Sequence, residues 1–139
     1  MTGQLSQKGA DRAVAAGVGQ NVTASAAMYI ALATAEPGTP DTATLGLFNV
    51  NEMTTSGYSR QAVTWGNPSG DPSEIANAGT VTFGPFSADP PNVTNAFLCD
   101  TSLGTAGTVL AYWTFDTPRN GVSGDSYRIA PGDLTLSVD

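Results

Sequence analysis

The sequence has no histidine, a single cysteine (Cys99) and a single lysine (Lys8) among its 139 residues. Histidine is a common general base and metal ligand, so its absence excludes catalytic triads and zinc sites in their standard forms. One cysteine cannot form an internal disulfide, and without a histidine to activate it we interpret Cys99 as a small apolar core residue. We therefore predict no catalytic residue, no metal ligand and no cofactor.

Charge is also scarce, since charged residues make up 12% of the chain, with five basic and twelve acidic side chains and a net charge of -7. Proteins that bind nucleic acids or anionic membranes need clustered Lys and Arg, so we predict neither partner. The acids are scattered singly, and their spacing along the chain does not reveal the facing pair of carboxylates that a glycosidase needs. We predict that the protein is not an enzyme.

Long apolar runs are missing as well. No stretch approaches the ~20 apolar residues of a membrane span. The N-terminal segment lacks the uninterrupted apolar stretch of ~7–15 residues that follows the basic start of a secretory signal. We expect a protein that is synthesised in a cytoplasm and is not inserted into a membrane.

The chain has the length of one domain, is 40% hydrophobic and begins with an Ala-rich segment. Residues 6–16 predict a short helix that ends where Gly17 adopts a left-handed conformation. We assign residues 1–25 to an N-terminal helix or docking arm and residues 26–139 to a β domain, so removal of residues 1–19 should leave the β domain folded. The candidate docking residues of the arm are Leu5, Lys8, Arg12 and Val14.

From residue 28 onward the apolar residues alternate with a period of two, as in β-strands. In residues 28–33 both alternating sets are apolar, which predicts a strand buried on both faces. Residues 41–57 are expected to form a loop with a short strand, while Asn120-Gly121 and Pro131-Gly132 predict hairpin turns. Further strands are expected at residues 58–65, 80–83, 96–100, 109–115, 126–130 and 134–138. The pattern predicts an all-β fold, an antiparallel β-sandwich of jelly-roll or immunoglobulin-like type with a short N-terminal helix or arm.

Four aromatic residues on the predicted strands have two interpretations. They can stack on sugars, as in a carbohydrate-binding module, or lie in the core or in an interface between subunits, which is the more frequent role and the one we favour. These residues are Tyr58, Trp65, Tyr112 and Trp113. Arg60 also has two interpretations, either an ion pair with an acidic residue, such as Asp100 or Asp116, or a solvated strand residue.

Several segments, in their order along the chain, resemble one protein family. Residues 28–34 (Met-Tyr-Ile-Ala-Leu-Ala-Thr) lead into Glu36-Pro37-Gly38, and residues 57–66 read Gly-Tyr-Ser-Arg-Gln-Ala-Val-Thr-Trp-Gly. Val81-Thr82-Phe83 follows, and the C-terminal part holds Gly124-Asp125 and Ala-Pro-Gly-Asp-Leu-Thr-Leu at residues 130–136. With the Ala-rich beginning, this order resembles small tail-fibre or minor tail proteins from tailed phages of actinobacteria. The chain departs from that pattern at residues 41–55 and 89–92.

The resemblance implies a non-enzymatic structural protein on the virion surface, made in the host cytoplasm and released by lysis. Two placements compete, a capsid decoration protein in very many copies and a tail-fibre or minor tail subunit in few. The implied partners are further copies of the chain in a symmetric homo-oligomer, for example a trimer, and the major capsid or tail proteins of the same phage. The alternative is a carbohydrate-binding module that contacts glycans of the host cell surface.

Overall fold

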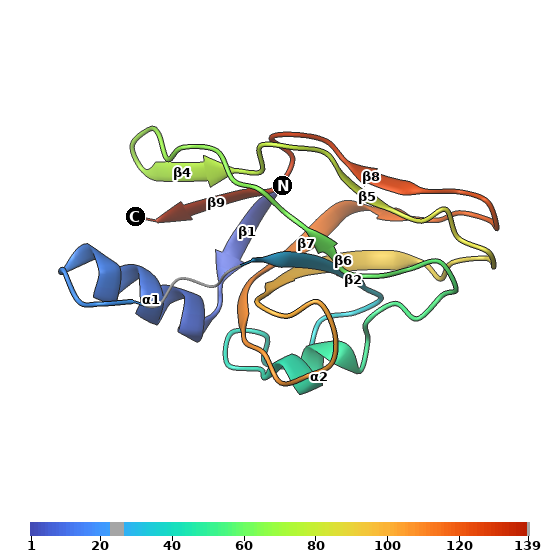
Figure 1. Ribbon diagram of the computed structural model, residues 1–139, viewed down its shortest axis with the longest axis horizontal. Coiled ribbons are helices and arrows are strands. Elements are labelled where there is room, and N and C mark those ends of the chain that lie inside the picture. The colour runs from blue at the N-terminus through green and yellow to red at the C-terminus, as the bar shows by residue number, and fades with distance from the viewer. Residues whose placement is uncertain (23–26, 139) are drawn as a thin grey trace.

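The computed structural model describes residues 1–22 and 27–138 of the chain. In these residues, two helices accompany nine strands (Figure 1). The helices are α1 (Gln7–Gly17) and α2 (Leu45–Asn49). The strands are β1 (Thr2–Leu5), β2 (Tyr29–Ala33), β3 (Gln61–Ala62), β4 (Ser73–Ala76), β5 (Val81–Phe83), β6 (Val93–Cys99), β7 (Val109–Arg119), β8 (Tyr127–Ile129) and β9 (Thr135–Val138).

The strands form a seven-stranded sheet in the order β3-β2-β6-β7-β1-β9-β4 and a two-stranded sheet of β5 and β8. Strand β1 pairs in parallel with β9, and the other strand pairs of the described residues are antiparallel. This division of seven and two is less equal than in a jelly roll or an immunoglobulin domain. The predicted all-β sandwich with a short N-terminal helix is confirmed.

Two apolar clusters lie on opposite faces of the central strands. One cluster fills the space between the large sheet and the β5–β8 pair, with Phe83 and Trp113 among its most buried members. The other lies between the large sheet and α2, where Phe48 packs against Phe97 at a ring-centre distance of 5.1 Å. Figure 1 shows these layers in order, from β5–β8 through the sheet to α2. The residues of β2 divide alternately between the clusters, so the predicted strand buried on both faces is confirmed.

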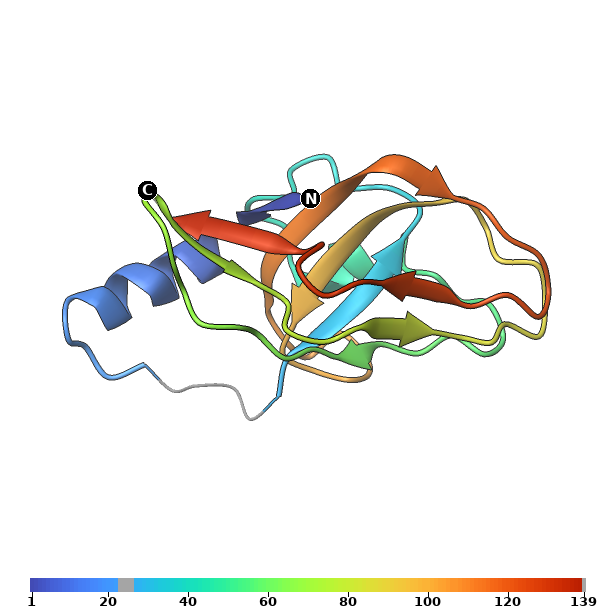
Figure 2. The same cartoon turned by 90° about the horizontal axis from the view of Figure 1, so that it is seen from above.

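Helix α1 is fixed closely to the sheet at its first turn. The Ser6 hydroxyl accepts a hydrogen bond from the backbone N–H of Gly9 (3.1 Å) and donates one to the carbonyl of Val109 (2.6 Å). Gly9 is buried against β7, where a Cβ atom would lie 2.1 Å from the carbonyl oxygen of Leu110. The rest of the helix projects from one end of the β structure (Figures 1 and 2).

The helix ends differently from the prediction. It includes Gly17, and the residue in the left-handed conformation is Gly19, with a φ of 78°. The backbone N–H groups of Gly19 and Gln20 donate to the carbonyls of Ala16 and Ala15, which satisfies the last turn of the helix.

The presence of strand β1 in the large sheet contradicts the prediction that the N-terminal segment is a separable arm. Residues 2–5 lie between β7 and β9 in the large sheet, and the backbone of Gly3 passes so close to Trp113 that a Cβ atom there would lie 2.3 Å from its indole nitrogen. Deleting residues 1–19 would remove an internal strand, so the expectation that the β domain folds without them is wrong. The predicted domain boundary after residue 25 lies outside the described residues.

Three other segments differ from their predictions. The loop predicted at residues 41–57 contains α2, which begins at the N-cap Thr44, and residues 58–65 contribute only the two-residue strand β3. Asn120-Gly121 forms no hairpin, because β8 pairs with β5 rather than with β7. Pro131-Gly132 does form a turn, with Asp133 N–H donating to the Ala130 carbonyl at 3.2 Å, but it leads from one sheet to the other.

Candidate functional site

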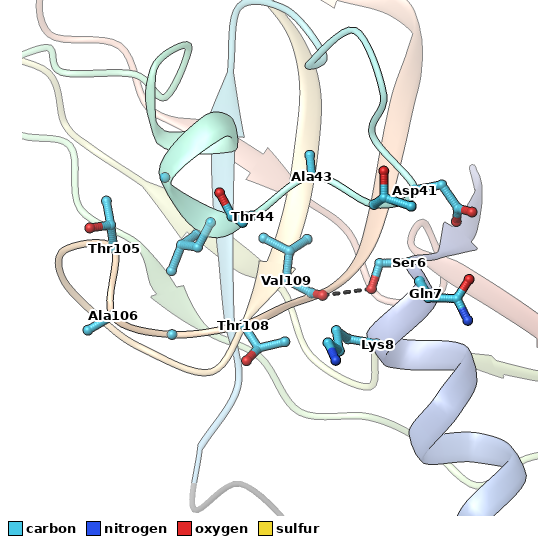
Figure 3. Close-up of a pocket in the computed structure, with 14 residues that line it drawn as sticks. Ser6, Gln7, Lys8, Asp41, Ala43, Thr44, Thr105, Ala106, Thr108 and Val109 are labelled. Atoms are coloured by element: carbon cyan, nitrogen blue, oxygen red, sulfur yellow. Dashed lines mark hydrogen bonds between the residues drawn. The ribbon is translucent and has the colours of Figure 1, made fainter.

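A pocket with a volume of about 510 Å³ lies where three segments meet. Its walls are the first turn of α1, residues 41–46, and residues 105–109 at the end of the β6–β7 loop and the start of β7 (Figure 3). The wall of α1 is fixed to the neighbouring segments by backbone hydrogen bonds from Ser6 N–H to the Leu110 carbonyl (3.0 Å) and from Gln7 N–H to the Asp41 carbonyl (2.8 Å). These hydrogen bonds hold the α1 wall of the pocket against the other two walls.

The lining of this pocket is aliphatic with a polar rim. Leu45 and Val109, both buried, line it together with Ala43 and Ala106. Figure 3 shows Lys8 on the α1 side and Ala106 on the loop side. The polar residues of the lining include four threonines, Lys8 and Asp41, and the lining contains no aromatic ring and no thiol. Such a lining suits an aliphatic group more than a catalytic reaction.

The projecting end of α1 is a second exposed feature. Val14 is 67% exposed and Val18 is 69% exposed, although both are aliphatic. They are four residues apart and so lie on one side of the helix. Ala13 and Ala16 are also exposed, but Ala16 lies on the opposite side of the helix. We call Val14 and Val18 the α1 tip.

The four predicted docking residues do not form one surface. Leu5 packs against the core from β1. Arg12 forms an ion pair with Asp100 at 3.5 Å and so binds α1 to the β domain. Lys8 lines the pocket and Val14 belongs to the exposed tip. Only the last two are accessible enough to meet a partner.

The four predicted aromatic site residues are parts of the core or pack against it. Trp113 is 1% exposed and Tyr112 is 7% exposed, so neither can present a ring to a sugar, and the glycan-stacking interpretation is wrong for both. Trp65 is half-buried and stacks on Trp113 at a ring-centre distance of 6.2 Å. Tyr58 stacks on Phe83 at 6.0 Å. The structure does not bring the four rings together as a platform.

Arg60 is a buried residue with a partner that the sequence analysis missed. Its guanidinium group binds both carboxylate oxygens of Glu52, at 2.8 and 2.6 Å, so Arg60 does form an ion pair, but with Glu52 and not with Asp100 or Asp116. The hydrogen bond with Glu52 raises the pKa of Arg60 above its usual value. The Tyr58 hydroxyl donates to Glu52 at 2.8 Å, and burial raises the pKa of Tyr58 well above its usual value.

This network connects three segments of the chain, and its charged groups are shielded from solvent, so a substrate cannot reach them. Arg60 also donates to the carbonyl of Thr101 at 3.2 Å, and the backbone N–H of Leu32 donates to the Tyr58 hydroxyl at 3.0 Å. The side chains of Arg60 and Glu52 are only 3% and 8% exposed. We interpret the network as structural, because it joins β2, the residues after α2 and the β6–β7 loop.

The remaining chemistry of the described residues is sparse. Cys99 is completely buried, as expected for a core residue, and burial raises the pKa of its thiol. Among residues 1–22 and 27–138, no group of three acidic or cysteine side chains is arranged to hold a metal ion. Within the same part of the chain, no helix has the length and hydropathy to cross a membrane.

Comparison with known proteins identifies the family. The family described as "Podophage GP4 fiber I protein gp80" matches residues 6–137, which is nearly the whole chain. The match includes both helices, all three walls of the pocket and strands β2 to β8. No curated protein matches the chain. The predicted resemblance to phage fibre proteins is therefore confirmed, while the predicted actinobacterial host stays a prediction. The chain belongs to the phage fibre family described as podophage GP4 fiber I protein gp80.

Proposed function

We propose that this chain is a non-enzymatic structural subunit of a phage fibre, exposed on the surface of the virion. The observation that carries the proposal is the family match over residues 6–137. The low charge content and the buried polar networks support it, because they suit a subunit whose role is to hold a shape. Release by host lysis accounts for a virion protein that reaches the outside without being secreted.

Of the two placements on the particle, we propose the fibre rather than the capsid. The description of the matching family names a fibre protein, which favours a tail-fibre or minor tail subunit over capsid decoration. A fibre subunit needs contacts with further subunits, and we propose that the chain assembles with copies of itself and with tail proteins of the same phage. The exposed α1 tip and the pocket are the surfaces best suited to such contacts.

The number of copies per particle tests this proposal. Quantitative mass spectrometry of purified virions, calibrated against the major capsid protein, should find the chain in a small number of copies. Hundreds of copies per particle would contradict the fibre and favour capsid decoration. Absence of the chain from purified virions would contradict any structural role in the particle.

A further inference from the structure

We propose that Asn120 is a site of spontaneous deamidation, at which water and the chain's own backbone convert the side-chain amide to an acid. Asn120 and Gly121 follow β7 and begin the β7–β8 loop, which lies at the end of the molecule opposite α1 (Figures 1 and 2). The sequence pattern predicts a hairpin turn at these two residues, but β8 pairs with β5 and not with β7. The structure therefore contains an Asn-Gly pair without the tight turn in which such pairs are commonly held.

The fold leaves the reacting groups of this pair open. Asn120 is exposed, and within the described residues neither its side-chain amide nor the backbone N–H of Gly121 has a hydrogen-bond partner. The next residue is held in place, since the Val122 N–H donates to the Asp125 carboxylate at 2.9 Å. No hydrogen bond must therefore break before the Asn120 side chain turns toward the Gly121 nitrogen.

Glycine at position 121 lowers the steric barrier to this reaction. It has no Cβ, so no side chain of its own shields its backbone nitrogen from the preceding residue. The fold favours glycine here, because a Cβ would lie 3.0 Å from the Asp125 carboxylate and 3.1 Å from the Tyr127 ring. The packing of the loop thus keeps the residue that makes Asn120 reactive.

The reaction needs only water as a co-reactant. The Gly121 nitrogen loses its proton and attacks the side-chain carbonyl carbon of Asn120, the bond from that carbon to the amide nitrogen breaks, and ammonia leaves with the proton. The resulting succinimide ring then takes up one water. Opening at the side-chain carbonyl gives aspartate, and opening at the main-chain carbonyl gives isoaspartate, whose backbone runs through the former side chain. Either product adds one negative charge to the net charge of -7.

The other asparagines lack one or more of these conditions. No other asparagine of the chain is followed by glycine. Asn77 is 2% exposed, and its amide donates two hydrogen bonds to backbone carbonyls, both at 2.9 Å. Asn67 precedes a proline, which has no N–H to lose. Asn92 is exposed, but Val93 follows it, and a β-branched side chain crowds the attacking nitrogen.

Incubation of the purified native chain for weeks at mildly alkaline pH tests the site. We expect an acidic form to accumulate on ion-exchange chromatography, with the mass difference between an amide and an acid. Mass spectrometry of its peptides should place the change at Asn120, and isoaspartyl methyltransferase should label the isoaspartate. Asn120→Gln should lose the acidic form, because the longer side chain closes its ring far more slowly. Asn92→Gln, at another exposed asparagine, is the matched control and should convert like the native chain.

A parallel incubation in guanidinium chloride separates the effect of the fold from that of the dipeptide. The unfolded chain sets the rate of an unrestrained Asn-Gly pair, and the native chain should form the acidic product over the same weeks. Conversion of the unfolded chain without conversion of native Asn120 would show that the loop protects the pair and would overturn the inference. An acidic form that persists in the Asn120→Gln chain would overturn it too. Both results are obtained on the purified chain, so they do not depend on the proposed place in a fibre.

Discussion

Replacing Gly9 by alanine tests how α1 is fixed to the sheet. Alanine is the better helix former by about 1 kcal/mol, so helix propensity alone predicts a more stable protein. In the structure, however, the new Cβ would lie 2.1 Å from the Leu110 carbonyl oxygen. The helix must therefore move away from β7 and weaken the hydrogen bonds of Ser6 to Val109 and Leu110. Overpacking of this kind costs about 1–3 kcal/mol, so after the gain in helix propensity we expect a net loss of up to about 2 kcal/mol.

The matched control is the same substitution at the other end of the same helix. A Cβ at Gly17 would meet nothing within 4 Å, so Gly17→Ala should leave the free energy of unfolding unchanged or raise it by up to about 1 kcal/mol. Urea unfolding followed by tryptophan fluorescence measures both variants. With a denaturant slope of about 1–3 kcal/mol per molar, a loss of 1 kcal/mol lowers the midpoint by roughly 0.3–1 M. Equal stabilisation by both substitutions would refute the close contact between α1 and β7.

Three further predictions concern the buried groups. Glu52→Gln should lower the free energy of unfolding by about 3–5 kcal/mol, because it leaves the buried Arg60 without a countercharge. Arg12→Gln removes the more exposed ion pair with Asp100 and should lower the free energy of unfolding by about 1 kcal/mol or less in the same urea assay. Burial raises the pKa of Cys99 above its usual value, so the folded state keeps a proton that the unfolded chain loses, and stability should fall as pH rises through the usual titration range of a thiol. Cys99→Ala should reduce that fall in thermal unfolding measured from pH 8 to 10, and an unchanged profile would contradict it. Trp65→Ala should lower the melting temperature because it removes the ring stacked on Trp113, and its retention on a glycan array should equal that of the native chain.

The strands of the fold were predictable wherever the side-chain pattern records burial. Strand β2 alternates between two apolar sets because each of its faces meets its own cluster, so its position and its two-sided burial could be derived from the sequence. The positions of strands β1 and β4 could not be derived in this way. Thr2–Leu5 and Ser73–Ala76 have few apolar residues, and they are strands because their backbones pair with β9 at residues far away in the sequence.

The role of Gly9 could not be predicted, for a physical reason that only the structure reveals. In the sequence a glycine inside a helix indicates weakness. In the fold it is the residue that lets the helix approach the Leu110 carbonyl. The pairing of Arg60 with Glu52 was missed in a similar way, because α2 and the turn after it were expected to be a loop. The pocket was beyond prediction, since its walls come from three segments that meet only in the folded chain.

The most direct test of the central claim is the position of this chain on the virion. Gold-labelled antibodies against the purified chain, applied to intact particles and viewed by electron microscopy, should label the fibres and leave the capsid unlabelled. Uniform label over the capsid, or no label on particles that contain the chain by mass spectrometry, would contradict an exposed fibre subunit.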